Sequence, residues 1–193
     1  GEPEEVATTL SKSTIPSLIT MIGSTETAKK VISDSSTSIK KYSMELGGNA
    51  PFIVFEDADI EVAINIGSAI KFGNCGQICV AANRFFVHEN VHKKFVDGLI
   101  KKARELKIGY NKNLDFDIGP LISKSSRERV NDLIKSTIDN GGKLEFGGEI
   151  PLMNGNWFEP TIITNVNESM SIFHMEIFGP VASIIKFNND DEV

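Results

Sequence analysis

The alternation of apolar and polar positions predicts strands followed by helices along most of the chain. A short apolar run at residues 17–22 ends at a glycine, and Ala28, Val31 and Ile32 follow at helical spacing. This order predicts a strand, a tight glycine turn and a helix. A second run, at residues 40–45, predicts another strand before the next pair of glycines.

The rest of the chain continues this pattern. Residues 52–55 form an uninterrupted apolar run, which is typical of a strand buried on both faces. Asp59 is placed to cap a helix that extends toward Phe72 and is broken by glycines. Amphipathic helices are predicted over residues 91–106 and 123–140. Further short strands are predicted at residues 84–88, 143–146, 158–163 and 181–187.

Strands that alternate with long helices predict an α/β fold with a largely parallel sheet. At Gly47 and Gly48 the chain passes from one predicted strand to the next with almost no connection. Parallel strands in one sheet need a longer crossover, so we expect the chain to pass between two lobes there. The predicted domains are residues 1–47 and 48–193.

Composition narrows the possible partners and locations. A net charge of -6 provides no electrostatic footprint for nucleic acid or an anionic membrane. The longest apolar stretch, residues 15–22, is far shorter than the roughly 20 residues of a membrane helix. Two closely spaced cysteines without a signal-like start favour a reducing compartment, and the cytoplasm is the expected location. The chain begins at Gly1 without Met, so we expect the sequence to start inside a longer gene product.

The first candidate for chemistry is Cys79, in the glycine-bearing segment Asn74-Cys75-Gly76-Gln77-Ile78-Cys79. Glycine permits close backbone approach, and an amide N–H at a turn can lower a thiol pKa and stabilise an oxyanion. The alternative is a buried cysteine that acts as a small hydrophobe, which by residue type alone is the more frequent case.

The sequence gives little support for a catalytic histidine or for a metal site. His88 and His92 fall at a strand end and a helix start, where a solvated position is more frequent than a catalytic one. Cys75 and Cys79 lack a second pair of Cys or His at zinc-like spacing, so no metal site is predicted.

Two further positions are candidates for a functional role. Glu45 ends an apolar strand, where partial desolvation could raise its pKa toward the range of a general base, although an exposed strand-end Glu is more common. Gly23 and Ser24 precede a helix whose first N–H groups could hold a phosphate, although the same pattern also occurs in ordinary strand-to-helix turns. The three-glycine dinucleotide fingerprint is absent from this sequence.

Taken together, these segments resemble the aldehyde dehydrogenase superfamily, in the order and spacing of that family. The resemblance extends along the whole chain and is closest to the succinate-semialdehyde dehydrogenase branch. The matching pieces are Gly23-Ser24-Thr25-Glu26, Glu45-Leu46-Gly47-Gly48-Asn49-Ala50-Pro51, Asp57-Ala58-Asp59, Gly76-Gln77-Ile78-Cys79, Ile118-Gly119-Pro120-Leu121-Ile122, Glu159-Pro160-Thr161 and Glu176-Ile177-Phe178-Gly179-Pro180.

The resemblance implies an NAD- or NADP-dependent oxidation of an aldehyde to the carboxylic acid. Cys79 would attack the aldehyde and pass through a thiohemiacetal and a thioester, and Glu45 would activate the hydrolytic water. The cofactor-binding residues implied by the family are Gly23 and Ser24 at the pyrophosphate, Leu46 and Phe178 near the nicotinamide, and Glu176 at its ribose.

The resemblance also bears on fold, assembly and substrate. Residues 1–47 would be the end of a partial Rossmann-like cofactor domain, and residues 48–193 a C-terminally incomplete, parallel-sheet catalytic domain. A homo-oligomer, dimer or tetramer, is implied. Gly73 stands where the succinate-semialdehyde branch usually has a carboxylate-binding Arg, so the substrate is either a semialdehyde or a hydroxyaldehyde.

Two alternatives of other classes stay open at this point. Family members are much longer, so the recorded chain could be an inactive fragment or an interaction module. A cysteine-dependent esterase or acyltransferase would need no nicotinamide. Cys75, four residues before the nucleophile, could also form a protective disulfide with it on oxidation.

Overall fold

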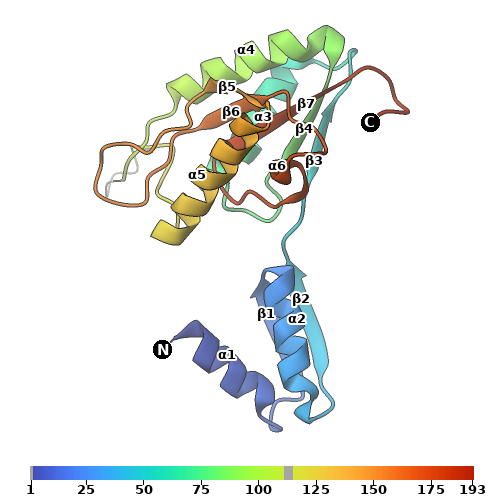
Figure 1. Ribbon diagram of the computed structural model, residues 1–193, viewed down its shortest axis with the longest axis vertical. Coiled ribbons are helices and arrows are strands. Elements are labelled where there is room, and N and C mark those ends of the chain that lie inside the picture. Colours follow the sequence, from blue (N-terminus) through green and yellow to red (C-terminus); the bar gives the residue numbers. More distant parts are fainter. Residues whose placement is uncertain (1, 111–114) are drawn as a thin grey trace. The chain divides into compact units, whose positions relative to one another are not determined.

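A computed structural model describes residues 2–110 and 115–193 of the chain (Figure 1). The chain divides into two units, an N-terminal unit Gly1–Gly48 and a C-terminal unit Asn49–Val193. The division falls beside the pair of glycines at which the sequence predicts a passage between lobes. The strands on either side of it belong to different sheets, so no crossover helix is needed between them.

The N-terminal unit is a β-α-β motif preceded by a helix. Its elements are α1 (Pro3–Lys12), β1 (Leu18–Gly23), α2 (Thr25–Asp34), the 3-10 turn η1 (Ser35–Thr37) and β2 (Lys41–Leu46). Strands β1 and β2 pair in parallel along their whole length. The predicted strand, glycine turn, helix and second strand are thus confirmed.

Helix α1 is an element that the hydrophobic pattern does not predict. It begins at Pro3, a residue favoured in the first turn of a helix, and the acidic Glu4 and Glu5 suit the positive end of the helix dipole. Its apolar residues Val6 and Leu10 are 48% and 58% exposed. Its apolar stripe is short and only partly buried, so it gives a weak signal in the sequence.

The C-terminal unit contains a five-stranded sheet in the order β3-β4-β7-β6-β5. Neighbouring strands are parallel except for β5 and β6, which confirms the expected α/β fold with a largely parallel sheet. Its elements are β3 (Pro51–Val54), α3 (Ile60–Phe72), η2 (Gly73–Gly76), β4 (Arg84–His88), α4 (Glu89–Glu105), α5 (Lys124–Asp139), β5 (Lys143–Phe146), β6 (Thr161–Thr164), α6 (Ser171–His174) and β7 (Val181–Phe187).

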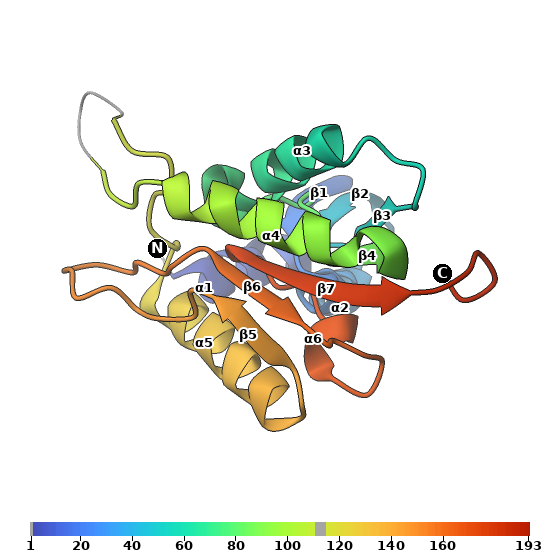
Figure 2. The same cartoon turned by 90° about the horizontal axis from the view of Figure 1, so that it is seen from above.

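Helices cover both faces of this sheet. Helices α3 and α4 pack against each other and against one face, and α5 lies against the other (Figure 2). The central strand β7 is buried over its first four residues, and β6 is buried throughout. The core between the layers includes Phe85, Phe95 and Leu99, each with no exposed surface. No helix in the described part of the chain is long and apolar enough to span a membrane.

The predicted cap at Asp59 is confirmed, and a second long helix begins with a cap of the same kind at Ser123. The Asp59 carboxylate accepts a hydrogen bond from the Val62 N–H at 3.1 Å, at the start of α3. The Ser123 hydroxyl accepts one from the Ser126 N–H at 3.0 Å, at the start of α5. Each cap satisfies an N–H group that the helix itself leaves without a partner.

Two of the strand predictions need correction. Strand β3 is an edge strand rather than one buried on both faces, because only β4 pairs with it and Ile53 is 43% exposed. Strand β6 begins at Thr161, three residues later than predicted. Pro160 has no N–H group to donate to the ladder, so pairing starts after it, although Phe158 is fully buried.

Candidate active site

Cys79 lies in a hydrogen-bonded turn that follows a strained stretch of backbone. The turn spans residues 78–81 and is closed by a 3.0 Å bond from the Ala81 N–H to the Ile78 carbonyl. The preceding residues Asn74, Cys75 and Gly76 have φ angles of 49°, 58° and 69°. Left-handed backbone is costly for residues other than glycine and concentrates at functional sites. The predicted helix end or loop is therefore a specifically shaped turn that presents an exposed thiol.

The side chain of Gln77 ties this turn to a distant loop. Its amide nitrogen donates to the carbonyl of Pro120 at 3.3 Å, and its amide oxygen accepts from the Ile122 N–H at 2.8 Å. On the near side, the Asn74 amide donates to the Gln77 carbonyl at 3.0 Å. Both ends of the Gln77 amide are used, so the turn and the loop are held together by polar contacts of fixed direction.

The backbone of Gly76 lies directly against that of Gly179. A β-carbon on Gly76 would come within 2.1 Å of the Gly179 carbonyl oxygen, and within 3.0 Å of the Lys71 carbonyl oxygen on the other side. Only glycine permits this approach. The segment that leads into the Cys79 turn and the loop after α6, which contains Glu176 and Phe178, are thus in contact.

The loop that contains Glu176 has irregular backbone and is itself strained. Phe178 adopts a φ of 47°, and the side chains of Glu176 and Phe178 are half-buried. The Arg129 guanidinium on α5 donates to the Glu176 carbonyl at 3.3 Å and to the Ile177 carbonyl at 2.5 Å. The two residues that the resemblance places near the nicotinamide are therefore held next to the segment that contains Cys79.

The two cysteines have opposite environments. Cys75 is 1% exposed, and burial raises the pKa of its thiol to about 12. Cys79 is exposed. Because the thiolate is the reactive form, the exposed Cys79 is the more accessible candidate for nucleophilic chemistry, and Cys75 has the character of a buried hydrophobe. A disulfide between the two cysteines stays a prediction.

A buried lysine lies at the last turn of α3, beneath this site. Lys71 is 1% exposed, and desolvation lowers the pKa of its ammonium group to about 7. Electrostatic interactions with Cys75 and Glu176 act in the opposite direction and raise the pKa of Lys71. Nothing in the local sequence marks Lys71 as buried, since lysine is among the residues least often found inside.

In the N-terminal unit, the predicted cofactor residues share one edge of the two-stranded sheet. The register pairs Ile22 with Glu45 and Gly23 with Leu46 at the carboxyl ends of β1 and β2. Ser24 then caps α2, with its hydroxyl accepting from the Thr27 N–H at 3.1 Å. The exposed amide end of α2 at Gly23 and Ser24 has the geometry of an anion site.

The environment of Glu45 differs from the partly desolvated one that its sequence position suggests. Its side chain is exposed. Strands β1 and β2 have no layer that covers this carboxylate, so the expected partial desolvation is not present within the N-terminal unit. The position of Glu45 at the end of β2, one residue before Leu46, agrees with the prediction.

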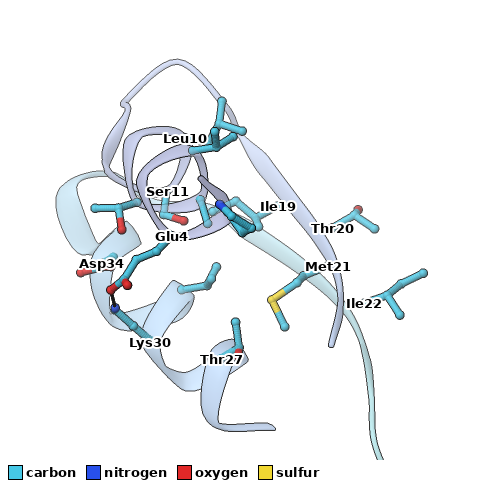
Figure 3. A pocket seen from close by; sticks show the side chains of 15 residues that line it. Glu4, Leu10, Ser11, Ile19, Thr20, Met21, Ile22, Thr27, Lys30 and Asp34 are labelled. Atoms are coloured by element: carbon cyan, nitrogen blue, oxygen red, sulfur yellow. Dashed lines mark hydrogen bonds and ion pairs between the residues drawn. The ribbon is translucent and has the colours of Figure 1, made fainter. Parts of the chain in front are cut away.

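A cavity of about 820 Å³ lies beside this edge, between α1, β1 and α2 (Figure 3). Its walls are mainly apolar and include Leu10, Ile19 and Val31. An ion pair between Glu4 of α1 and Lys30 of α2 joins the two helices there. Its hydrogen bond and charge lower the pKa of Glu4 and raise that of Lys30. The cavity has the size and lining of a site for a flat organic group.

His88 has a structural role. His88 is buried rather than solvated: its Nδ1 accepts from the Asn90 N–H at 3.3 Å, and its Nε2 is 3.1 Å from the Asn188 carbonyl. This arrangement makes it the N-cap of α4. Among residues 2–110 and 115–193, no group of three or more His, Cys, Asp or Glu side chains is arranged to hold a metal ion.

Several residues of the site were not identified from the sequence. They are polar side chains that hold irregular backbone, namely Lys71, Gln77, Asn83 and Arg129. Gln77 and Asn83 lie near Cys79, but partners of their side chains include Pro120, 43 residues from Gln77, and Ile177, 94 residues from Asn83. No local pattern reveals such pairings.

We expect alkylation to distinguish the two thiols. Brief treatment of the folded chain with iodoacetamide near pH 8 should modify Cys79 at least roughly tenfold faster than Cys75, because Cys75 is buried and protonated. Peptide mass spectrometry measures the two extents, and a urea-unfolded sample, in which both thiols react, is the control. Equal labelling of the folded chain would contradict the assignment.

The lysine beneath the site should make stability depend on pH. The folded-state pKa of Lys71 is near 7 and its unfolded value is 10.5, so the unfolded state binds more protons between these values and stability rises with pH. Above about pH 9 the raised pKa of Cys75 acts in the opposite sense. Between about pH 7 and 9, the free energy of unfolding should therefore rise by about 1.4 kcal/mol per pH unit relative to Lys71→Met.

The fluorescence of Trp157, the single tryptophan, reports urea unfolding of the C-terminal unit. Parallel pH profiles for the wild-type and Lys71→Met chains would show that Lys71 is charged in the folded state throughout this range.

Comparison with known proteins agrees with this geometry. Residues 1–193 match the sequence model of the aldehyde dehydrogenase family. A succinate-semialdehyde dehydrogenase [NADP(+)] of Schizosaccharomyces pombe is 42% identical over 176 residues, which cover 91% of this chain and 36% of that protein.

Solved structures give the same result. The crystal structure of succinate-semialdehyde dehydrogenase from Burkholderia pseudomallei superposes with a TM-score of 0.95 at 36% identity, covering 100% of this chain and 40% of that one. Betaine aldehyde dehydrogenase from Staphylococcus aureus, in complex with NAD+, superposes at 0.94 with 31% identity, covering 100% of this chain and 39% of that one. The chain thus spans about two fifths of the length of these relatives. It belongs to the aldehyde dehydrogenase family, whose members related to it use NAD+ or NADP+.

Proposed function

We propose that the protein oxidises an aldehyde to its carboxylic acid with NAD or NADP, using Cys79 as the nucleophile. The observation that carries this proposal is the turn at Cys79, which presents an exposed thiol beside the loop of Glu176 and Phe178. The buried Cys75 cannot take this role without unfolding the turn around it. The activity is proposed for the full-length protein, since this chain spans about two fifths of its relatives.

The residues of the N-terminal unit fit a dinucleotide. The amide end of α2 at Gly23 and Ser24 would hold the pyrophosphate, where the helix dipole favours negative charge. The apolar cavity between α1 and α2 begins one turn away, at Thr27, and would take the adenosine. Leu46, paired with Gly23 across the sheet, would then face the nicotinamide end.

Two residues of the C-terminal unit suit the nicotinamide half of such a cofactor. The Glu176 carboxylate can accept two hydrogen bonds from the hydroxyl groups of a ribose. Phe178 offers a ring for packing against the nicotinamide. When bound, the dinucleotide supplies the acceptor for the hydride that leaves the substrate carbon.

The chemistry at the chain's own residues proceeds by covalent catalysis. The Cys79 thiolate adds to the aldehyde carbon, forming a C–S bond while the carbonyl oxygen becomes an oxyanion that the Cys79 N–H can stabilise. Loss of hydride from that carbon re-forms the carbonyl as a thioester. Glu45 takes a proton from water as the water oxygen attacks, and the C–S bond breaks to release the acid and the thiolate.

We infer a semialdehyde or a hydroxyaldehyde as the substrate. Similarity to succinate-semialdehyde dehydrogenases supports a semialdehyde. The absence of a cation at Gly73 favours an uncharged hydroxyaldehyde, because a bidentate guanidinium is the usual means of holding a carboxylate. The homo-oligomer and the cytoplasmic location inferred from the sequence stay predictions.

Pre-steady-state kinetics test the two catalytic residues. In the full-length protein, Glu45→Gln should produce a burst of about one reduced cofactor per Cys79. The steady-state rate that follows should be at least roughly a hundredfold lower than in the wild type, because the thioester forms but is not hydrolysed. Cys79→Ala should give no burst while still binding the cofactor. A Cys79→Ala enzyme that turns over at a normal rate would exclude the mechanism, and ester hydrolysis without any cofactor reduction would favour the esterase alternative.

The substrate proposal can be tested by adding the missing cation. Gly73 has an ordinary negative φ of -53°, and an added β-carbon would meet no heavy atom within 4 Å, so a side chain is tolerated there. Gly73→Arg should lower the KM for succinate semialdehyde by roughly tenfold and leave that for glyceraldehyde unchanged. Gly73→Met is the uncharged control. An equal change for both aldehydes would show that position 73 does not contact the substrate carboxylate.

A further inference from the structure

The short segment Met175, Glu176 and Ile177 is held by side chains from other parts of the C-terminal unit. Irregular backbone cannot satisfy its own polar groups, so buried N–H and C=O groups in such a segment need partners from elsewhere. Here the partners are the amide of Asn83 and the guanidinium of Arg129. Glu176 lies between the two points at which Asn83 holds the chain.

Asn83 makes a hydrogen bond with every polar atom of its side chain. Its Nδ2 donates to the Met175 carbonyl at 2.7 Å and to the Asn49 Oδ1 at 2.5 Å. Its Oδ1 accepts from the Ile177 N–H at 2.9 Å. A carbonyl can only accept and an N–H can only donate, so the orientation of the amide is unambiguous.

The backbone of Asn83 is anchored as firmly as its side chain. Its N–H donates to the Ala50 carbonyl at 2.9 Å, beside β3, and its carbonyl accepts from the Ser183 hydroxyl on β7 at 2.6 Å. The residue is 3% exposed. A fully satisfied buried amide of this kind fixes one conformation, because any displacement leaves a polar group without a partner.

Asn83 also belongs to the nucleophile segment. It is four residues after Cys79 and immediately precedes β4. One rigid side chain therefore joins the segment that bears the thiol to both neighbours of Glu176. Arg129 holds the carbonyl groups of Glu176 and Ile177 but comes from α5, so it does not make this connection.

We propose that Asn83 is a positioning residue for the nicotinamide cofactor. Its amide sets the place of the Glu176 carboxylate relative to the Cys79 turn, and so the place of the cofactor ribose relative to the adduct on the thiol. This inference rests on the proposed role of Glu176 as a ribose-binding residue. Small displacements of such groups have large effects, because hydride transfer requires close and aligned approach.

The test compares two variants of the full-length protein that each remove buried hydrogen bonds at Asn83. Asn83→Ser removes the bonds on both sides of Glu176, whereas Ser183→Ala removes only the bond to the Asn83 carbonyl. Both should lower thermal stability. Only Asn83→Ser should raise the KM for the dinucleotide, by roughly tenfold or more, with a smaller fall in kcat. An Asn83→Ser enzyme with wild-type KM would overturn the inference.

A double variant separates this inference from the function on which it rests. If Asn83 acts through Glu176, Asn83→Ser should leave the dinucleotide KM unchanged in a Glu176→Ala background. The same increase in both backgrounds would overturn the positioning role. If Glu176→Ala alone leaves the KM unchanged, the ribose-binding role of Glu176 is wrong and the inference falls with it.

A second substitution covers the case in which Asn83→Ser does not fold. Asn83→Asp has the same size and keeps the acceptor for the Ile177 N–H, but it loses both donors. The dinucleotide KM should again rise, and titration calorimetry with the dinucleotide should show the same loss of affinity. Unchanged affinity in a folded Asn83→Asp enzyme would overturn the proposal.

Discussion

The candidate site depends on one close approach of backbone to backbone. The α-carbon of Gly76 faces the carbonyl of Gly179 with no room for a β-carbon, and its φ of 69° excludes most other residues as well. This contact joins the segment that leads into the Cys79 turn to the loop that contains Glu176 and Phe178. A larger residue at Gly76 would push the two segments apart, and the thiol would lose its neighbours even if the sheet and its helices stayed intact.

In irregular backbone, N–H and C=O groups lack partners within a helix or sheet and need hydrogen bonds from other parts of the chain. This requirement explains the polar side chains around the contact. Gln77 and Asn83 each use both ends of their amide on loops far along the chain, and Arg129 adds two donors from α5. These side chains are buried or partly buried because they supply hydrogen bonds to the backbone of the loops. The same contacts that satisfy the loops also fix the positions of the groups that would act in catalysis.

The sequence predicts the regular elements well because their signals are local. The cap at Asp59 and the strand before Ser24 are found from neighbouring residues alone. The prediction fails where a distant partner decides the outcome. Whether an apolar strand is central or at an edge depends on which other strands pair with it. The sequence of β3 alone therefore does not reveal that β3 is an edge strand and β7 a central one. The candidate site residues come from motifs, but Asn83 could not be assigned its role, since its partner Ile177 lies 94 residues away.

Most of the unfavourable features described in the C-terminal unit gather in one place. Three of its four described non-glycine residues with left-handed backbone, Asn74, Cys75 and Phe178, lie there, while the fourth, Asn165, follows β6. Lys71 is an ammonium group whose burial lowers its pKa to about 7. None of these features stabilises the fold, since left-handed side-chain residues and desolvated charges both cost free energy. The helices and strands around them follow the usual rules of capping and burial. The concentration of strained backbone around one exposed thiol supports the proposed role of Cys79 rather than of its buried neighbour.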